Sequence, residues 1–309
     1  MYPLAVLTLL TLQNTSSAHK FGASVFSHDD EYRKLVLFKR RLLERHHHVL
    51  PQLYVVSIDI SKSYDTIKHH KLYALVQQLF QQDEYLVQQM KRTQIKSNSA
   101  TTRHHYLVHG AGLGSFPQFA KLAATMAQSL RNAILSDVVN YDYEETSSLL
   151  QLLHHHIFHN IVKDGDKSYL QCEGIPQGSI LSALLCSLYY GHLEATHLSS
   201  LPLHGTVDAK SDAGLLLRFI DDFLYITPHK AHAVEFTRRM YQGYADYGCT
   251  VNKKKTLVNF ELVIDGFLVP QVPTRNDGKN LMPWCGWLID TRQLEIEGDY
   301  SRYQANCTY

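Results

Sequence analysis

The sequence lacks the cysteine spacing that a zinc site or a disulfide framework requires. Its five cysteines are scattered through 309 residues and never form C-x-x-C, so a reducing compartment is expected. The apolar run Leu4–Leu12 is too short to span a bilayer. With Ser16–Ala18 it resembles a secretory signal, but no basic residue precedes it. No membrane association is therefore expected.

Acidic residues are missing between Glu84 and Asp137, where the basic residues are Lys91, Arg92, Lys96, Arg103, Lys121 and Arg131. The formal net charge of +1 is too small to indicate a nucleic-acid binder by itself. A local positive face can nevertheless bind phosphates in a protein that is nearly neutral overall. This stretch is therefore a candidate phosphate-contacting surface.

Hydrophobic periodicity predicts a mixture of helices and strands. Residues 21–309 are expected to form one α/β unit with mixed or antiparallel strands, whereas residues 1–20 form an atypical segment that need not belong to the fold. The histidine runs His46–His48 and His154–His156 are expected in solvated loops. The expected helices are Asp29–Arg45, Lys68–Met90, Phe116–Leu135, Ile180–Leu193 and Ala231–Tyr247, with a basic, turn-rich connection over Lys91–His109 and a hairpin turn at Asp164-Gly165 before the strand Ser168–Cys172.

The stretch Gly214–Thr227 predicts a tight hairpin. Two β-favouring apolar runs, Leu215–Ile220 and Phe223–Thr227, are separated only by Asp221 and Asp222, which we expect at its tip. Adjacent carboxylates beside apolar strands repel each other and resist desolvation. They indicate a bound cation, and oxygen ligands suit Mg²⁺ or Mn²⁺. A solvated Asp-Asp turn is the alternative.

A third acid, far upstream, favours the cation site. Leu53–Ile60 is apolar on both alternating faces apart from Ser57 and Asp59, as expected of a strand covered on two sides. Asp59 is thus predicted at the C-terminal end of a buried strand, where ligand sites in α/β folds often lie.

Five segments together resemble the motifs of reverse transcriptases, and specifically of telomerase catalytic subunits. Motifs A, B′, C, D and E are matched in order by Asp59–Ile67, Gln171–Gly191, Leu215–Pro228, Gly248–Phe260 and Trp284–Asp290, and Gly22–Val25 with Asp29 and Asp30 resembles the segment before motif A. Five motifs in the right order are far more specific than any one of them. Retroelement enzymes, the alternative within this class, usually carry proline after the serine of the B′ helix and alanine or methionine before the acid pair. Ser182–Cys186 and Phe219-Ile220 differ from that pattern and favour telomerase.

The resemblance implies a right-hand polymerase palm, an α/β (α+β) fold with a mixed or antiparallel sheet flanked by helices and partial fingers. The family's RNA-binding domain, finger motifs 1 and 2 and thumb have no counterpart in these 309 residues. The implied function is RNA-templated DNA polymerisation, by a chain that we expect to be incomplete. A non-catalytic palm-fold fragment that binds nucleic acid or a partner is the alternative from a different class.

The resemblance also implies roles for single residues. Asp59 and Asp221 would hold two Mg²⁺ ions, or Mn²⁺, with Asp222 completing the site and the Ile60 carbonyl as a further ligand. Lys255 corresponds to the motif D lysine proposed to protonate pyrophosphate.

The remaining matches concern the nucleotide, the template and the primer. Tyr64 would lie under the incoming sugar and exclude a 2′-hydroxyl; a core tyrosine is its alternative reading. Gln177 and Gly178 would contact nucleotide and template. Arg218 could pair with a backbone phosphate or with the acids, and the sequence does not decide. The primer grip would comprise Trp284, Cys285 and Gly286. The implied partners are telomerase RNA, a telomeric DNA primer and deoxynucleoside triphosphates, in the nucleus at telomeres.

Overall fold

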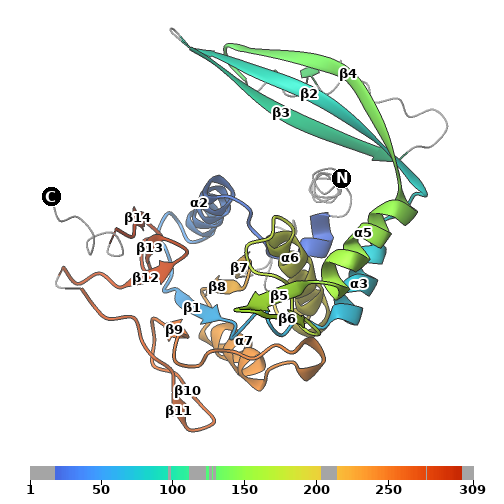
Figure 1. Cartoon of the computed structure of the whole chain (residues 1–309). Helices are drawn as coiled ribbons and strands as arrows, with labels where there is room; N and C mark the ends of the chain where they lie inside the picture. The colour runs from blue at the N-terminus through green and yellow to red at the C-terminus, as the bar shows by residue number, and fades with distance from the viewer. Residues whose placement is uncertain are drawn as a thin grey trace, which may run out of the picture. The chain divides into compact units, whose positions relative to one another are not determined.

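The computed structural model describes residues 18–96, 99–110, 123–124, 127, 130–202, 214–275 and 277–300. The chain divides into two compact units, whose elements Figure 1 labels. The discontinuous unit comprises Lys20–Lys68 and Leu185–Tyr309, and the inserted unit comprises His69–Leu184 together with Met1–His19. The assignment of residues 21–309 to one palm with partial fingers, and of residues 1–20 to a separate segment, stays a prediction.

The discontinuous unit is organised around a four-stranded antiparallel sheet. Its strands are β7 (Leu215–Phe219), β8 (Asp222–Thr227), β1 (Tyr54–Asp59) and β9 (Leu257–Val258), in the order β7-β8-β1-β9. The two strands predicted from the acid-bearing stretches, β1 and β8, are therefore direct neighbours at the centre of the sheet.

Both faces of this sheet are covered, which explains why its strands carry apolar side chains on both faces. On one face, Leu224 and Ile226 belong to a core cluster with Phe38 of helix α2 (His28–Arg45). On the other face, the Phe223 ring contacts Tyr190 of α6 (Ser182–Leu193), and the Tyr225 ring lies 5.0 Å from Phe236 of α7 (Lys230–Gln242). Helix α2 begins at His28, one residue before the predicted Asp29, and the Ser27 side chain caps it by accepting a hydrogen bond from the Asp30 backbone N–H.

A second sheet joins the same core through Met282, Trp284 and Ile289. Its strands are β12 (Leu281–Trp284), β13 (Trp287–Asp290) and β14 (Ile296–Gly298), and Cys285 and Gly286 form the turn between the first two. The remaining elements of this unit are the hairpin of β10 (Val263–Ile264) and β11 (Phe267–Leu268) and three short helical segments, η1 (Ala18–Phe21), η2 (Glu194–Leu198, π-helical) and η3 (Ala245–Tyr247).

The inserted unit contains a long three-stranded antiparallel sheet (Figure 1). Strand β2 (Glu84–Lys96) lies between β3 (Ser99–Gly110) and β4 (Ala133–Glu145). Helices α3 (His69–Gln77) and α5 (Thr146–Phe158) contact each other through the Tyr73 ring, which meets His154 and Phe158. The predicted turn at Asp164-Gly165 is confirmed by the hairpin of β5 (Ile161–Asp164) and β6 (Lys167–Leu170).

Two predictions in this unit are wrong. The helix expected over Lys68–Met90 ends at Gln77, and Glu84 onward is strand β2; the turn-rich connection Lys91–His109 is the rest of β2 and most of β3. Glutamine, methionine and lysine in β2 favour helices locally. Strand pairing on both sides of β2 satisfies its backbone groups and outweighs that preference.

Other predictions are partly corrected. His154–His156 lie in helix α5 and not in a loop, whereas His46–His48 form a turn as expected. The helix expected over Phe116–Leu135 falls largely outside the described residues, and its last part belongs to β4. Helix α7 ends at Gln242 before Gly243, earlier than the predicted Tyr247. No helix within the described ranges is long and apolar enough to cross a membrane.

Candidate active site

The acid-bearing hairpin forms where predicted, but its tip lies one residue earlier. Phe219 pairs with Asp222, so the loop residues are Ile220 and Asp221, and Asp222 is the first residue of β8. The expectation that both carboxylates lie at the tip is therefore wrong for Asp222. Ile220 has a φ of 60°, a left-handed conformation that a β-branched residue rarely adopts. The local cost of this conformation indicates that surrounding contacts hold the turn.

Asp59 ends β1 directly opposite Asp222. Directly opposite side chains lie on the same face of an antiparallel pair, with Cβ atoms about 4.5–5.5 Å apart, and like charges there are destabilising. Asp221 adjoins this pair in the turn. The structure therefore brings the upstream acid together with the two hairpin acids, as the sequence predicts.

Burial and mutual repulsion perturb the hairpin acids. Burial raises the pKa of Asp222 to about 6, and the charges of Asp221 and Asp59 add to this effect. Burial also raises the pKa of Asp221, against a hydrogen bond from Ser63 that favours the ionised form. The site thus concentrates negative charge in a region of restricted hydration.

Each of the three carboxylates has a different side-chain partner. Lys255 Nζ lies 3.3 Å from Asp59 Oδ1, and Ser63 Oγ donates to Asp221 Oδ2 at 2.5 Å. The Cys285 thiol donates weakly to Asp222 Oδ2 at 3.7 Å. Ser63 has no signal in the sequence analysis, because its partner is 158 residues away.

These partners bear on metal binding. In the part of the chain that the structure describes, no group of three or more His, Cys, Asp or Glu side chains is arranged to hold a metal ion. The three acids are close enough to raise the pKa of Asp222, but each carboxylate is turned to another neighbour. Carboxylate oxygens are the ligands that Mg²⁺ and Mn²⁺ prefer. The chemistry of these donors therefore suits a divalent cation, although their arrangement in the described residues does not form a metal-holding group.

Tyr64 lies near the hairpin acids and is half-buried. Burial raises the pKa of its phenol, with smaller contributions from Cys186 and Asp221, so the hydroxyl stays protonated at neutral pH. The backbone of Ile60 forms a β-bridge with Val251 and is buried.

Of the proposed primer-grip residues, Trp284 ends β12, and Cys285 and Gly286 form the turn between β12 and β13. The Trp284 side chain is buried in the core, whereas Cys285 and Gly286 have positive φ values of 47° and 84°. This turn presents the Cys285 thiol to Asp222 and thereby links motif E to the acids. Gln177 and Gly178 lie in the inserted unit between β6 and α6, and their contact with nucleotide and template stays a prediction.

Arg218 is shielded from a backbone phosphate in solvent, and its charge opposes the rise in the pKa of Asp221 that burial causes, but its direct carboxylate partner is Glu194. Its side chain is fully buried, and its Nε lies 2.5 Å from Glu194 Oε1. Glu194 was not singled out by the sequence analysis, since an acid after a helix has no distinctive pattern.

Comparison with known proteins agrees with this geometry. Residues 142–262 match the family model described as reverse transcriptase (RNA-dependent DNA polymerase). The chain is 34% identical to the telomerase reverse transcriptase of Bos taurus and 36% identical to that of Canis lupus familiaris, in each case over 96% of its own length. It spans 26% of the length of each of these relatives.

Two solved telomerase structures have a similar fold. The apo telomerase from Candida tropicalis superposes with a TM-score of 0.62 at 20% identity, covering 100% of this chain and 41% of that one. Telomerase from Candida albicans, in complex with a TWJ fragment of telomeric RNA, gives 0.61 at 21% identity, covering 96% of this chain and 38% of that one. The palm-type polymerase fold expected from the motifs is therefore confirmed. By its sequence, the chain belongs to the telomerase reverse transcriptases and corresponds to their reverse transcriptase region.

Proposed function

We propose that this chain is the catalytic region of an RNA-templated DNA polymerase that extends a DNA 3′ end. The observation that carries the proposal is the pairing of Asp59 with Asp222, with Asp221 in the adjoining turn. Three carboxylates with one nearby lysine suit phosphoryl transfer, which depends on positioning and on neutralising charge more than on covalent chemistry.

Reverse transcriptases use divalent metal ions, and we propose that Asp59, Asp221 and Asp222 hold two Mg²⁺ ions, or Mn²⁺, with the Ile60 carbonyl as a further ligand. When bound, such ions lower the pKa of an attacking hydroxyl and stabilise the leaving group. The raised pKa of Asp222 supports this assignment, because the site favours a neutralising partner.

Lys255 is proposed to provide positive charge and a proton on the leaving-group side. Its ammonium group contacts Asp59 and its side chain is 65% exposed, so the ammonium group can turn from the carboxylate to a phosphate. An exposed lysine on a flexible stem has the mobility that this exchange requires.

Tyr64, Gln177 and Gly178 are proposed to position the incoming nucleotide and template. A neutral, half-buried phenol near Asp221 could pack against a deoxyribose and leave no room for a 2′-hydroxyl. Trp284, Cys285 and Gly286 would hold the primer end. Their turn supports this role because it reaches the acids through Cys285.

The proposed partners are telomerase RNA, a telomeric DNA primer and deoxynucleoside triphosphates, and the proposed location is the nucleus, at telomeres. The relatives named telomerase reverse transcriptase support this assignment, as does a similar fold in a complex with telomeric RNA.

The test compares Asp221→Asn with Asp265→Asn. Asp265 also lies in a hairpin turn, between β10 and β11, and therefore controls for the loss of a turn aspartate. We expect Asp221→Asn to abolish primer extension by the protein assembled with telomerase RNA and to weaken Mn²⁺ binding by the chain itself. Asp265→Asn should change neither. Near-normal extension by Asp221→Asn would refute the site, whereas no extension by the unmodified protein, assembled in the same way, would favour a non-catalytic, nucleic-acid-binding palm.

A further inference from the structure

The acid-bearing hairpin is anchored by a buried ion pair that the proposed reaction does not use. Arg218 of β7 is fully buried and Glu194 is 4% exposed, and their side chains are in direct contact. Removing two charges from water is costly, and their attraction often fails to recover that cost. Stability alone is therefore a weak reason for this pair.

The guanidinium group of Arg218 reaches the hairpin tip. Its Nη1 donates to the Ile220 carbonyl at 2.8 Å, and its Nη2 donates to the carbonyls of Phe21 at 2.9 Å and Ser187 at 3.0 Å. These donors lie in one rigid plane, so the acceptors together define the orientation of the group. The Ile220 carbonyl is thereby held relative to Ser187 of helix α6 and to the segment Phe21–Val25, called here the N-terminal segment.

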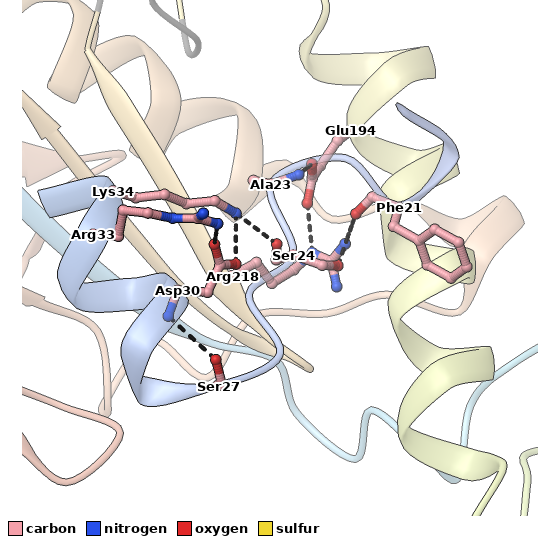
Figure 2. A network of polar contacts seen from close by, with 9 residues as sticks. All are labelled: Phe21, Ala23, Ser24, Ser27, Asp30, Arg33, Lys34, Glu194 and Arg218. Carbon is pink, nitrogen blue, oxygen red and sulfur yellow. Dashed lines mark hydrogen bonds and ion pairs between the residues drawn. The ribbon is translucent and has the colours of Figure 1, made fainter. Parts of the chain in front are cut away.

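Glu194 fixes the other side of the network (Figure 2). Its Oε1 accepts from Arg218 Nε, and its Oε2 accepts from the Ala23 backbone N–H at 2.6 Å. Gly22 has a φ of 57°, and a Cβ atom at this position would overlap the Glu194 carboxylate. The N-terminal segment is thus shaped around this side chain.

Backbone hydrogen bonds complete the attachment. The Arg218 N–H donates to the Ala23 carbonyl at 3.0 Å, and the Val25 N–H donates to the Arg218 carbonyl at 2.8 Å. The segments Phe21–Val25 and Ser187–Glu194, distant in sequence from β7, therefore both contact Arg218, which lies two residues before Ile220.

The contact with Ile220 gives this network a consequence for the acids. Ile220 has a positive φ that its β-branched side chain disfavours, and Asp221 and Asp222 follow it directly. A change in the Ile220 peptide would redirect both carboxylates. We propose that Arg218 is a positioning residue: it holds the Ile220 carbonyl and so sets the direction of Asp221 and Asp222, while Glu194 orients the guanidinium group. The inference rests on the proposed function of these acids.

Two variants test this proposal. Arg218→Lys keeps the positive charge, but lysine lacks the planar guanidinium group that donates to Glu194 and to the Ile220 carbonyl at once. The double variant Arg218→Met/Glu194→Leu removes both buried charges, a replacement that commonly preserves stability. Arg239→Lys is the matched control, because Arg239 also pairs with an acid, Glu235, but has no hydrogen bond to the hairpin.

The measurement is the affinity of the folded chain for Mn²⁺, followed by electron paramagnetic resonance, together with the metal dependence of primer extension. We expect Arg218→Lys and the double variant to bind Mn²⁺ about 10-fold more weakly, as for other residues that orient metal ligands. Extension should recover partly at high metal concentration, with the KM for nucleotide little changed. Arg239→Lys should match the unmodified chain.

A purely structural role predicts a different result. It would lower the unfolding midpoint of Arg218→Lys and leave the Mn²⁺ affinity of the folded protein unchanged, which would overturn the proposal. If Arg218→Lys does not fold, the double variant provides the test, and an unchanged Mn²⁺ affinity of the double variant would likewise overturn the proposal.

Ile220→Gly keeps the buried pair and should bind Mn²⁺ normally. A 10-fold loss of Mn²⁺ affinity in this variant would assign the positioning to Ile220 and refute the role of Arg218. Asp221→Asn, measured alongside, reports separately on whether these acids bind metal at all.

Discussion

The hairpins β7–β8 and β2–β3 place arginine in opposite surroundings. In β7–β8, Arg218 is fully buried and meets one carboxylate and three backbone carbonyls. In β2–β3, Arg92 lies directly opposite Arg103, and the two line a pocket of about 160 Å³ with Gln94 and Thr101. A buried guanidinium requires fixed partners, whereas two partly hydrated ones can face each other because water screens their repulsion. The first arrangement fixes a geometry, and the second leaves positive charge available to an anion.

The largest expected difference concerns loss of the buried acid. Glu194→Ala would leave Arg218 without a countercharge and should lower the free energy of unfolding by about 4 kcal/mol. The matched surface change is Glu235→Ala, whose carboxylate pairs with Arg238 and Arg239 on α7. That change should cost less than about 1 kcal/mol. Urea denaturation of both variants measures the contrast, and equal losses would contradict it.

A second difference concerns apolar side chains. Leu217→Ala in β7 removes a fully buried side chain and should cost about 3 kcal/mol. Ile134 in β4 is 57% exposed, so Ile134→Ala should cost well under half as much. Thermal unfolding followed by circular dichroism would compare them. A larger loss at Ile134 would mean that the inserted sheet depends on apolar contacts that its exposure does not reveal.

The acids make the stability of the first hairpin depend on pH. The folded-state pKa of Asp222 is raised from 3.8 to about 6, so the folded protein binds this proton more tightly than the unfolded chain does. The contribution of Asp222 therefore becomes less favourable as pH rises from about 4 to about 6, by an amount on the order of 2 kcal/mol. Chemical denaturation with and without Mg²⁺ tests this. Asp222→Asn and saturating Mg²⁺ should each flatten the slope in that window, and an unchanged slope in Asp222→Asn would contradict the assignment.

The smallest effect is expected in the second hairpin. Arg103→Ala should raise the free energy of unfolding by about 0.2–0.5 kcal/mol at low salt, because directly opposite like charges destabilise a strand pair. The gain should disappear near 1 M salt, where screening is strong. Arg103→Lys keeps the charge and serves as the control. Destabilisation by Arg103→Ala at low salt would show that the arginine pair contributes favourable contacts.

The sequence by itself determined the elements whose signals are local. Short apolar, β-favouring runs predicted β1, β7 and β8, and an apolar face with acids at its start and bases at its end predicted α2. The order of the motifs identified the family and named Asp59, Asp221 and Asp222 before any geometry was known. These inferences succeeded because an apolar run, the charge order of a helix and the residues of each single motif are local features of the sequence.

Tertiary structure decided the rest. Helix-favouring residues in β2 form a strand because partners on both sides satisfy its backbone. The register of β7 against β8 moved Asp222 out of the turn and put Ile220 into a strained one. Ser63 reaches Asp221 across 158 residues, and Glu194 reaches Ala23 across 171. Such pairings depend on which distant groups share one low-dielectric interior, and neither propensity nor spacing along the chain carries that information.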